Sequence, residues 1–190
     1  MRKQGRGTDM KPKDVVMTAL KLGQPPRPPV WVWGGGMFAV AQAGTTFEAV
    51  KTDVKKMVDY NVEVYTRAGL DAVFVGSGFT SFPVEAMGGK LKYLGMEAPS
   101  VVEPAIRRLE DVEKLDVKKM EGHPVINAVW EAARQVQKKI GDERLVCMVS
   151  WGPISLAGRM FGVQEMMVEM IQSPEKVKKL VTFGANYTHE

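Results

Sequence analysis

The stretch Pro29-Val30-Trp31-Val32-Trp33-Gly34-Gly35-Gly36-Met37 joins an apolar run to three consecutive glycines. Residues 30–33 are β-branched or aromatic, which is the composition of a buried strand. The glycines carry no Cβ, so the backbone after such a strand and a ligand can approach each other closely. Ligands of α/β proteins bind at the C-terminal ends of parallel strands. The pattern therefore predicts a strand and a ligand-contacting segment, the first exit (residues 33–37). An ordinary turn after a strand is the alternative.

The residues that follow predict a βαβ unit. Thr45 and Glu48 have the spacing of a helix N-cap and its reciprocal partner. Apolar residues recur at helical spacing over residues 47–65, and Gly69 supplies a residue that can end the helix in the left-handed conformation. A second strand, residues 70–75, follows at once. Strand, helix and strand in this order favour a parallel pair.

A third strand is predicted at residues 145–150, after a helix over residues 125–140 with one apolar stripe. The connection 76–121 is too long for an ordinary loop and includes a strand-like piece at residues 90–94. We interpret this connection as a functional insertion on the C-terminal face of the sheet. Two further helices are expected after the third strand, the last one beginning at Ser173-Pro174-Glu175.

The order of elements predicts an α/β protein with about three parallel strands and intervening helices. A complete TIM (β/α)₈ barrel has eight strands and typically ~250 residues, whereas this chain has 190 and shows no fourth strand. The expected organisation is therefore a basic flexible tail, residues 1–13, followed by the N-terminal half of a (β/α)₈ barrel, residues 14–190.

Composition excludes several classes of protein. The net charge is +4, and much of the basic charge lies in residues 1–13, without interleaved aromatic residues, so nucleic-acid binding is not expected. No apolar run approaches the ~20 residues of a membrane span, and no signal peptide is expected. The single cysteine, Cys147, cannot form an intramolecular disulfide, which fits the cytoplasm. It lies inside a predicted strand, where packing is the ordinary role of a cysteine.

Two more segments follow predicted strands. The second exit (residues 76–81) reads Gly76-Ser77-Gly78-Phe79-Thr80-Ser81, and the third exit (residues 150–153) reads Ser150-Trp151-Gly152-Pro153. Arg159 follows shortly and has the geometry to bind a carboxylate or phosphate through two hydrogen bonds. Local backbone hydrogen bonds of the hydroxyls and a surface position of Arg159 are the alternatives. The expected substrate or cofactor contacts are Trp33, Gly34, Gly35, Gly36, Met37, Ser77, Gly78, Phe79, Ser150, Trp151 and Arg159.

No catalytic residue and no metal ligand is assigned from these patterns. His123 precedes Pro124 at a helix start, and His189 lies next to the last residue. Neither has a cysteine or another histidine at the spacing of a zinc site. Paired carboxylates at a strand end, which acid–base chemistry would need, are not evident.

The sequence resembles the superfamily of uroporphyrinogen decarboxylase and the corrinoid-dependent methyltransferases. The resemblance rests on segments in order along nearly the whole chain: Pro29-Val30-Trp31, Asp71-Ala72-Val73-Phe74, Pro83-Val84-Glu85-Ala86-Met87-Gly88, Gly152-Pro153-Ile154-Ser155-Leu156-Ala157 and Ser173-Pro174-Glu175. It implies a (β/α)₈ barrel with its pocket at the C-terminal strand ends.

The chain departs from the decarboxylase branch of this superfamily at the substrate site. That branch carries arginines after its first strand that grip substrate carboxylates, and their positions here are Gly34 and Phe38. An aspartate that meets the pyrrole nitrogens corresponds to Gly78, and a tyrosine after the third strand corresponds to Arg159. Each lost charge-assisted bond is worth roughly 1.5–3 kcal/mol. The resemblance therefore disfavours uroporphyrinogen decarboxylation.

The methyltransferase branch tolerates a glycine-rich first exit. The resemblance implies methyl transfer between methylcobalamin on a corrinoid protein and a small donor or acceptor. Some members of the branch use zinc held by a His-x-Cys pair and a later cysteine, which belong to the second half of the barrel. Decarboxylation in porphyrin biosynthesis is the alternative activity. A non-catalytic fragment that self-associates or needs a complementary half is the alternative of another class.

Overall fold

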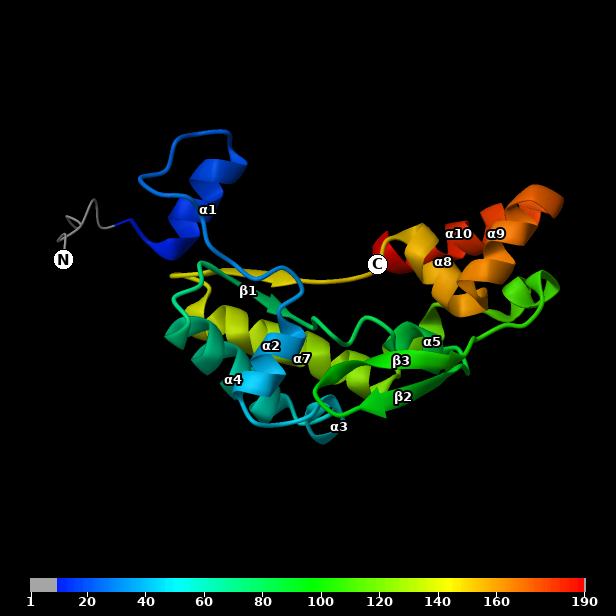
Figure 1. The fold of residues 1–190 in the computed structure, drawn as a ribbon, viewed down its shortest axis with the longest axis horizontal. Helices are drawn as coiled ribbons and strands as arrows, with labels where there is room; N and C mark the ends of the chain where they lie inside the picture. Colours follow the sequence, from blue (N-terminus) through cyan, green and yellow to red (C-terminus); the bar gives the residue numbers. More distant parts are fainter. Residues whose placement is uncertain (1–9, 190) are drawn as a thin grey trace.

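The computed structural model describes residues 10–189 and shows a mixed α/β protein (Figure 1). The strands are β1 (Ala72–Val75), β2 (Lys90–Leu94), β3 (Glu97–Glu103) and β4 (Leu145–Met148). The helices are α1 (Pro12–Leu20), α2 (Gly36–Gln42), α3 (Phe47–Val50), α4 (Val54–Arg67), α5 (Phe82–Ala86), the 3₁₀ helix η1 (Leu109–Lys114), α6 (Lys118–Glu121), α7 (Pro124–Ile140), α8 (Pro153–Phe161), α9 (Val163–Gln172) and α10 (Pro174–His189).

The parallel sheet consists of β1 and β4, in which Ala72 is aligned with Leu145 and Val75 with Met148. Both strands lie where the sequence predicts them, and their parallel pairing is confirmed. Helices α4 and α7 pack against each other and cover one face of the sheet, while α1 lies on the opposite side (Figure 1). The covered face and the two helices form the first core, which includes Met57, Tyr65, Val73, Val75, Val129 and Val136.

Helix α7 forms as predicted. Pro124 lies at its first turn, where the fixed φ of proline suits a helix start, and Gly141 follows its last residue. Its buried residues recur every three or four positions and face the first core: Val125, Ala128, Val129, Ala132, Ala133 and Val136. The local pattern alone therefore specifies this helix.

The prediction of a single helix over residues 47–65 is wrong, because the chain forms two helices there, α3 and α4. Thr46, rather than Thr45, caps α3 by accepting a hydrogen bond from Ala49 N. Asp53 caps α4 in the same way, accepting from Lys56 N. Side-chain acceptors of this kind favour a new helix start over a continuous helix. Gly69 does end α4 in the left-handed region, with φ +67°.

The long connection after β1 contains more structure than its sequence shows. The predicted strand at residues 90–94 is β2, and it pairs with β3 in an antiparallel hairpin that the sequence did not predict. The chain then passes through η1 and α6 to α7. Three helices, rather than two, follow β4, and α8, α9 and α10 lie together at one end of the molecule (Figure 1). They form the second core with α5 and η1, which includes Val84, Leu109, Leu156, Met160 and Leu180.

The prediction of a buried strand at residues 30–33 is wrong. Val30 is 53% and Trp33 78% exposed, and the described part of the sheet has two parallel strands rather than three. Val30 O accepts a hydrogen bond from Asp71 N at 2.8 Å, but Val30 N donates to the Asp71 carboxylate at 2.7 Å. The side chain thus takes the donor that a strand ladder would use, and the two preceding prolines have no N–H to offer.

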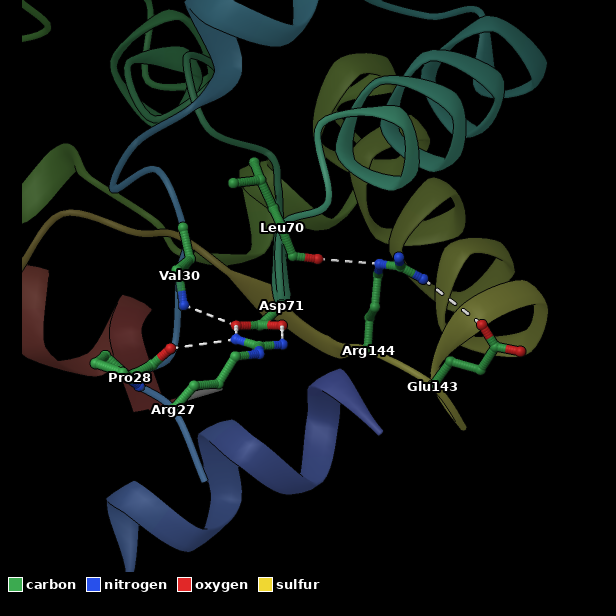
Figure 2. Close-up of polar contacts among 7 residues, drawn as sticks. All are labelled: Arg27, Pro28, Val30, Leu70, Asp71, Glu143 and Arg144. Atoms are coloured by element: carbon green, nitrogen blue, oxygen red, sulfur yellow. Dashed lines mark hydrogen bonds and ion pairs between the residues drawn. The ribbon is translucent and has the colours of Figure 1, made fainter. Parts of the chain in front are cut away.

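Asp71 ties this extended segment to the beginning of β1 (Figure 2). Its carboxylate accepts hydrogen bonds from both terminal nitrogens of Arg27, each at 2.6 Å. The Asp71 side chain is fully buried, whereas that of Arg27 is 46% exposed. Burial opposes ionisation, but the hydrogen bonds from Arg27 and Val30 outweigh it, so the pKa of Asp71 lies below its ordinary value. Nearby, Arg144 Nε donates to Leu70 O at 3.0 Å.

The pH dependence of stability tests this contact. Because the folded-state pKa of Asp71 is lowered, the ion pair stabilises the fold above the unfolded pKa of roughly 3.9. That contribution is lost as the pH falls through the folded-state pKa. We expect urea unfolding to show Asp71→Asn less stable than the wild type near pH 6, with a smaller difference near pH 3. An equal difference at both pH values would contradict the role of the charge.

Two further expectations concern the N-terminal tail and membrane-spanning helices. The predicted tail extends to residue 13, but α1 begins at Pro12, and Lys13 N donates to Glu143 O at 2.8 Å. Residues 1–9 of that tail lie outside the described residues. Within residues 10–189, no helix combines the length and hydrophobicity that crossing a membrane requires.

Candidate functional site

The first and second exits lie directly against each other. Gly36 N donates a hydrogen bond to Ser77 Oγ at 3.0 Å, and Ser77 is buried. A Cβ at Gly36 would lie 1.8 Å from Ser77 O, a distance that no side chain tolerates. At Gly36 the group that lies close to the backbone is therefore the second exit rather than a ligand. The two exits together form one wall at the C-terminal end of β1.

The remaining small residues of this wall have different surroundings. Gly35 lies under the hydroxyl of Tyr65, which a Cβ would meet at 2.7 Å. Gly78 has φ +92° and lies against the Phe47 ring, so a side chain there would be both strained and blocked. Gly34 is the open position, because a Cβ would have only Ser77 Oγ nearby, at 3.8 Å. Gly34 is therefore the glycine beside which a ligand has room to approach the backbone.

Aromatic side chains flank the wall on both sides. The Trp33 ring meets Phe74 of β1 edge to face, with centroids 5.5 Å apart, yet Trp33 remains largely exposed. Met37 is also half exposed. Phe79 is buried between Phe47 and Phe82, with centroid distances of 5.2 and 5.6 Å. Trp33 and Met37 therefore offer an accessible apolar surface, while Phe79 mainly holds the second exit in place.

The third exit reaches the second through Arg159 of α8. The guanidinium lies 4.3 Å from the centroid of the Trp151 ring, a cation–π distance. Its Nη1 donates to Ser81 Oγ at 3.3 Å. Burial lowers the pKa of Arg159 from its ordinary value, but arginine remains charged near neutral pH. The structure therefore brings Trp151 and Arg159 against the end of the second exit.

A cavity of about 260 Å³ opens beside the second and third exits. Gly76, Phe79 and Ser150 line it, whereas residues 33–37 do not. Burial raises the pKa of the Tyr187 hydroxyl above its ordinary value, an effect that its hydrogen bond with Ser150 partly offsets. The sequence analysis missed Trp130 and Tyr187, which line the same cavity from α7 and α10. Both lie within helices, so no local pattern marks them.

The predicted contacts therefore form two groups. Trp33, Gly34, Gly35, Gly36 and Met37 lie with Ser77 and Gly78, and Ser150, Trp151 and Arg159 lie toward α8 and α10. Phe79 and the other residues of the second exit lie between them. The C-terminal ends of β1 and β4 carry both groups, which is the edge where α/β proteins bind ligands.

His123 takes part in a separate polar pair. Its Nε2 lies 3.4 Å from Glu85 Oε2, and its Nδ1 is buried without a hydrogen-bond partner in the described part of the chain. Burial lowers the pKa of His123, although the Glu85 charge opposes this effect. The imidazole is therefore neutral at pH 7, next to Phe82. Sequence reasoning did not pair these residues, because α5 and α7 meet only in the fold.

Residues 10–189 contain neither a cluster of side chains suited to a metal ion nor an activated thiol. No group of three or more His, Cys, Asp or Glu side chains lies close enough there to hold a metal ion. Cys147 of β4 is a free, half-buried cysteine, aligned with Phe74 on β1. Burial raises the pKa of its thiol, so it is protonated near neutral pH and is a weak nucleophile.

Comparisons with known proteins agree with this architecture. No curated protein matches the sequence at a significant level. The fold is similar to that of a methyltransferase from Methanosarcina mazei, with a TM-score of 0.78 and 20% sequence identity. The aligned region covers 94% of this chain and 53% of the methyltransferase, so the chain spans about half of that protein. Residues 11–190 match the family described as uroporphyrinogen decarboxylase (URO-D), over nearly the whole chain, and the chain therefore belongs to the URO-D family.

Proposed function

We propose that this chain is part of a methyltransferase that moves a methyl group between a corrinoid protein and a small molecule. The observation that carries the proposal is the absence of a cation from the first exit. The positions corresponding to the carboxylate-gripping arginines of the decarboxylase branch are Gly34 and Phe38. Glycine and phenylalanine carry no charge, so neither position supplies a cation. A substrate with eight carboxylates would find no cation at the first exit and only Arg159 at the end of the second exit.

The exposed side chains at this wall suit a large apolar cofactor carried by another protein. Trp33 is 78% and Met37 50% exposed, and both belong to the first exit, on either side of Gly34 in the sequence. An aromatic ring and a flexible thioether supply the apolar contact that a macrocycle can use. Methylcobalamin would supply a methyl group that leaves its cobalt–carbon bond without the electron pair. This chain's part is to receive the corrinoid protein's exposed cofactor and to hold the small molecule nearby.

The complete reaction requires more of the barrel than the described elements. The chain spans 53% of the methyltransferase that it resembles in fold, so the proposal includes further strands and helices from a complementary half. A zinc site, if the acceptor is a thiol, belongs to that half, where the methyltransferase branch carries its His-x-Cys pair. We place the protein in the cytoplasm, where the free Cys147 would stay reduced.

The intact protein, incubated with methylcobalamin and either a small thiol or tetrahydrofolate, tests the proposal. We expect a spectral change as the corrinoid loses its methyl group, matched by methylated acceptor on mass spectrometry. Uroporphyrinogen serves as the competing substrate. Formation of coproporphyrinogen at an enzymatic rate, with kcat of ~1 s⁻¹ or more, would overturn the proposal in favour of decarboxylation. Absence of methyl transfer from methylcobalamin to either acceptor would also count against the proposal.

A further inference from the structure

Arg159 differs from the other arginines of the described chain in having no acidic partner. Every other arginine there has a carboxylate oxygen within 3.7 Å: Arg27 with Asp71, Arg67 with Glu63, Arg107 with Glu103, Arg108 with Asp111, Arg134 with Glu131 and Arg144 with Glu143. Among the described residues, Arg159 has one hydrogen bond, to the neutral hydroxyl of Ser81. Most of its five N–H donors are therefore available.

The surroundings of Arg159 hold its guanidinium in place without neutralising it. The Trp151 ring lies 4.3 Å from it, and Ser81 is 4% exposed. Burial disfavours the charged form, with no charged neighbour to offset it. A partly buried charge without a counterion raises the free energy of the empty site. Binding an anion would recover that cost, and the planar fork of arginine matches a carboxylate through two hydrogen bonds.

A groove of about 650 Å³ lies beside the guanidinium, between β3, α8 and α9. Its volume falls in the range of small-molecule sites. Apart from Arg159, its walls carry no charged side chain and include Val102, Ile154, Val163, Met166 and Met167. Trp151 also lines the groove, and its Nε1 is buried without a partner in the described part of the chain. The groove thus combines one cation with flexible apolar walls.

We propose that Arg159, held in place by Ser81 and Trp151, binds the carboxylate of a small amphipathic molecule whose apolar part lies along Met166 and Met167. One cation balances one carboxylate, whereas a phosphate dianion would leave a charge unpaired. This inference rests on the proposed function only in taking the bound molecule to be the methyl donor or acceptor. The binding itself requires no methyl transfer.

Direct binding of simple carboxylates tests the proposal. The intact protein is titrated with butyrate and 4-phenylbutyrate by calorimetry, and with 4-phenylbutanamide and inorganic phosphate for comparison. We expect 4-phenylbutyrate to bind at least tenfold more tightly than its uncharged amide, and more tightly than either butyrate or phosphate. Equal affinity of the acid and the amide, tighter binding of phosphate, or no saturable binding below about 10 mM would overturn it.

Variants assign the binding to the groove. Arg159→Met should weaken 4-phenylbutyrate binding at least tenfold and leave the amide unaffected, and Arg159→Lys should restore part of the loss. Arg67→Met removes a paired arginine on the surface of α4 and should change neither affinity. Unchanged affinity in a folded Arg159→Met protein would refute the inference. If that variant does not fold, the comparison of acid and amide on the wild type decides.

The outcomes separate this inference from the proposed function. Carboxylate binding that depends on Arg159, in a protein without methyl transfer, supports the subsite and contradicts the methyltransferase. Methyl transfer that is unchanged in Arg159→Met, together with unchanged carboxylate affinity, supports the methyltransferase and contradicts the subsite.

Discussion

Replacing Gly36 with alanine is expected to lower the free energy of unfolding by about 3 kcal/mol or more. Gly36 begins helix α2, and alanine is intrinsically the better helix former by up to ~1 kcal/mol. Helix propensity alone therefore predicts a more stable protein. The added methyl would overlap Ser77 O, which belongs to the backbone and cannot rotate away. Helix α2 would have to move, and the bond from Gly36 N to Ser77 Oγ would be lost.

Urea unfolding of the wild type, Gly36→Ala and Gly122→Ala measures this effect. Gly122 follows α6, and a Cβ there would meet no atom within 4 Å. The control should therefore stay within about 0.5 kcal/mol of the wild type. An unchanged or higher stability of Gly36→Ala would show that the two exits do not touch in solution.

The second large effect that we expect is self-association of the polypeptide of residues 1–190 when it is produced alone. Apolar side chains on α9 are exposed: Val163, Met167, Val168, Met170 and Ile171, the last at 86%. Near the open edge of β4, Met148 is 41% exposed. Covering a few hundred Å² of such surface is worth on the order of 10 kcal/mol at ~25 cal/mol/Å². That is comparable to the ~5–15 kcal/mol by which domains are stable.

Sedimentation at low micromolar concentration should therefore give a mass above the 21.0 kDa of one chain. A double substitution, Met167→Lys with Ile171→Lys, places charge on the exposed face of α9 and should shift the population toward the monomer. A matched pair on a surface that is already charged, Lys55→Gln with Glu63→Gln on α4, should not. A compact monomer of the wild-type polypeptide with one cooperative melt would show that the exposed faces need no cover.

The sequence predicted those elements whose signals are local. Helix α7 carries its own start, stripe and stop, and β1 and β4 are short apolar runs between helices. The failures are elements decided by distant residues. The segment 30–33 has the composition of a strand, but the Asp71 carboxylate takes the Val30 N–H. Strand β3 forms by pairing with β2. Its own residues mix apolar and polar side chains without a clear strand pattern, so the sequence did not predict it.

The candidate site was predictable in composition and not in arrangement. Glycines after a strand mark a close approach, yet only the fold shows that Ser77 is the group approaching Gly36. Arg159 could be named as an anion-binding candidate from its type alone. That it has no carboxylate partner in the described chain, unlike Arg27, depends on where each acidic residue lies in space. Trp130 and Tyr187 were missed for the same reason.

The contact between Gly36 and Ser77 also decides how this protein can be given new ligands. Any side chain at position 36 would overlap the backbone of Ser77, whose hydroxyl accepts the hydrogen bond from Gly36 N, so changes at either position are expected to destabilise the fold. Trp33 and Met37 are exposed and Arg159 lines a groove, so their side chains can change size and charge without displacing backbone. Selection experiments on ligand preference should randomise positions 33, 37 and 159 and keep 36 and 77 fixed.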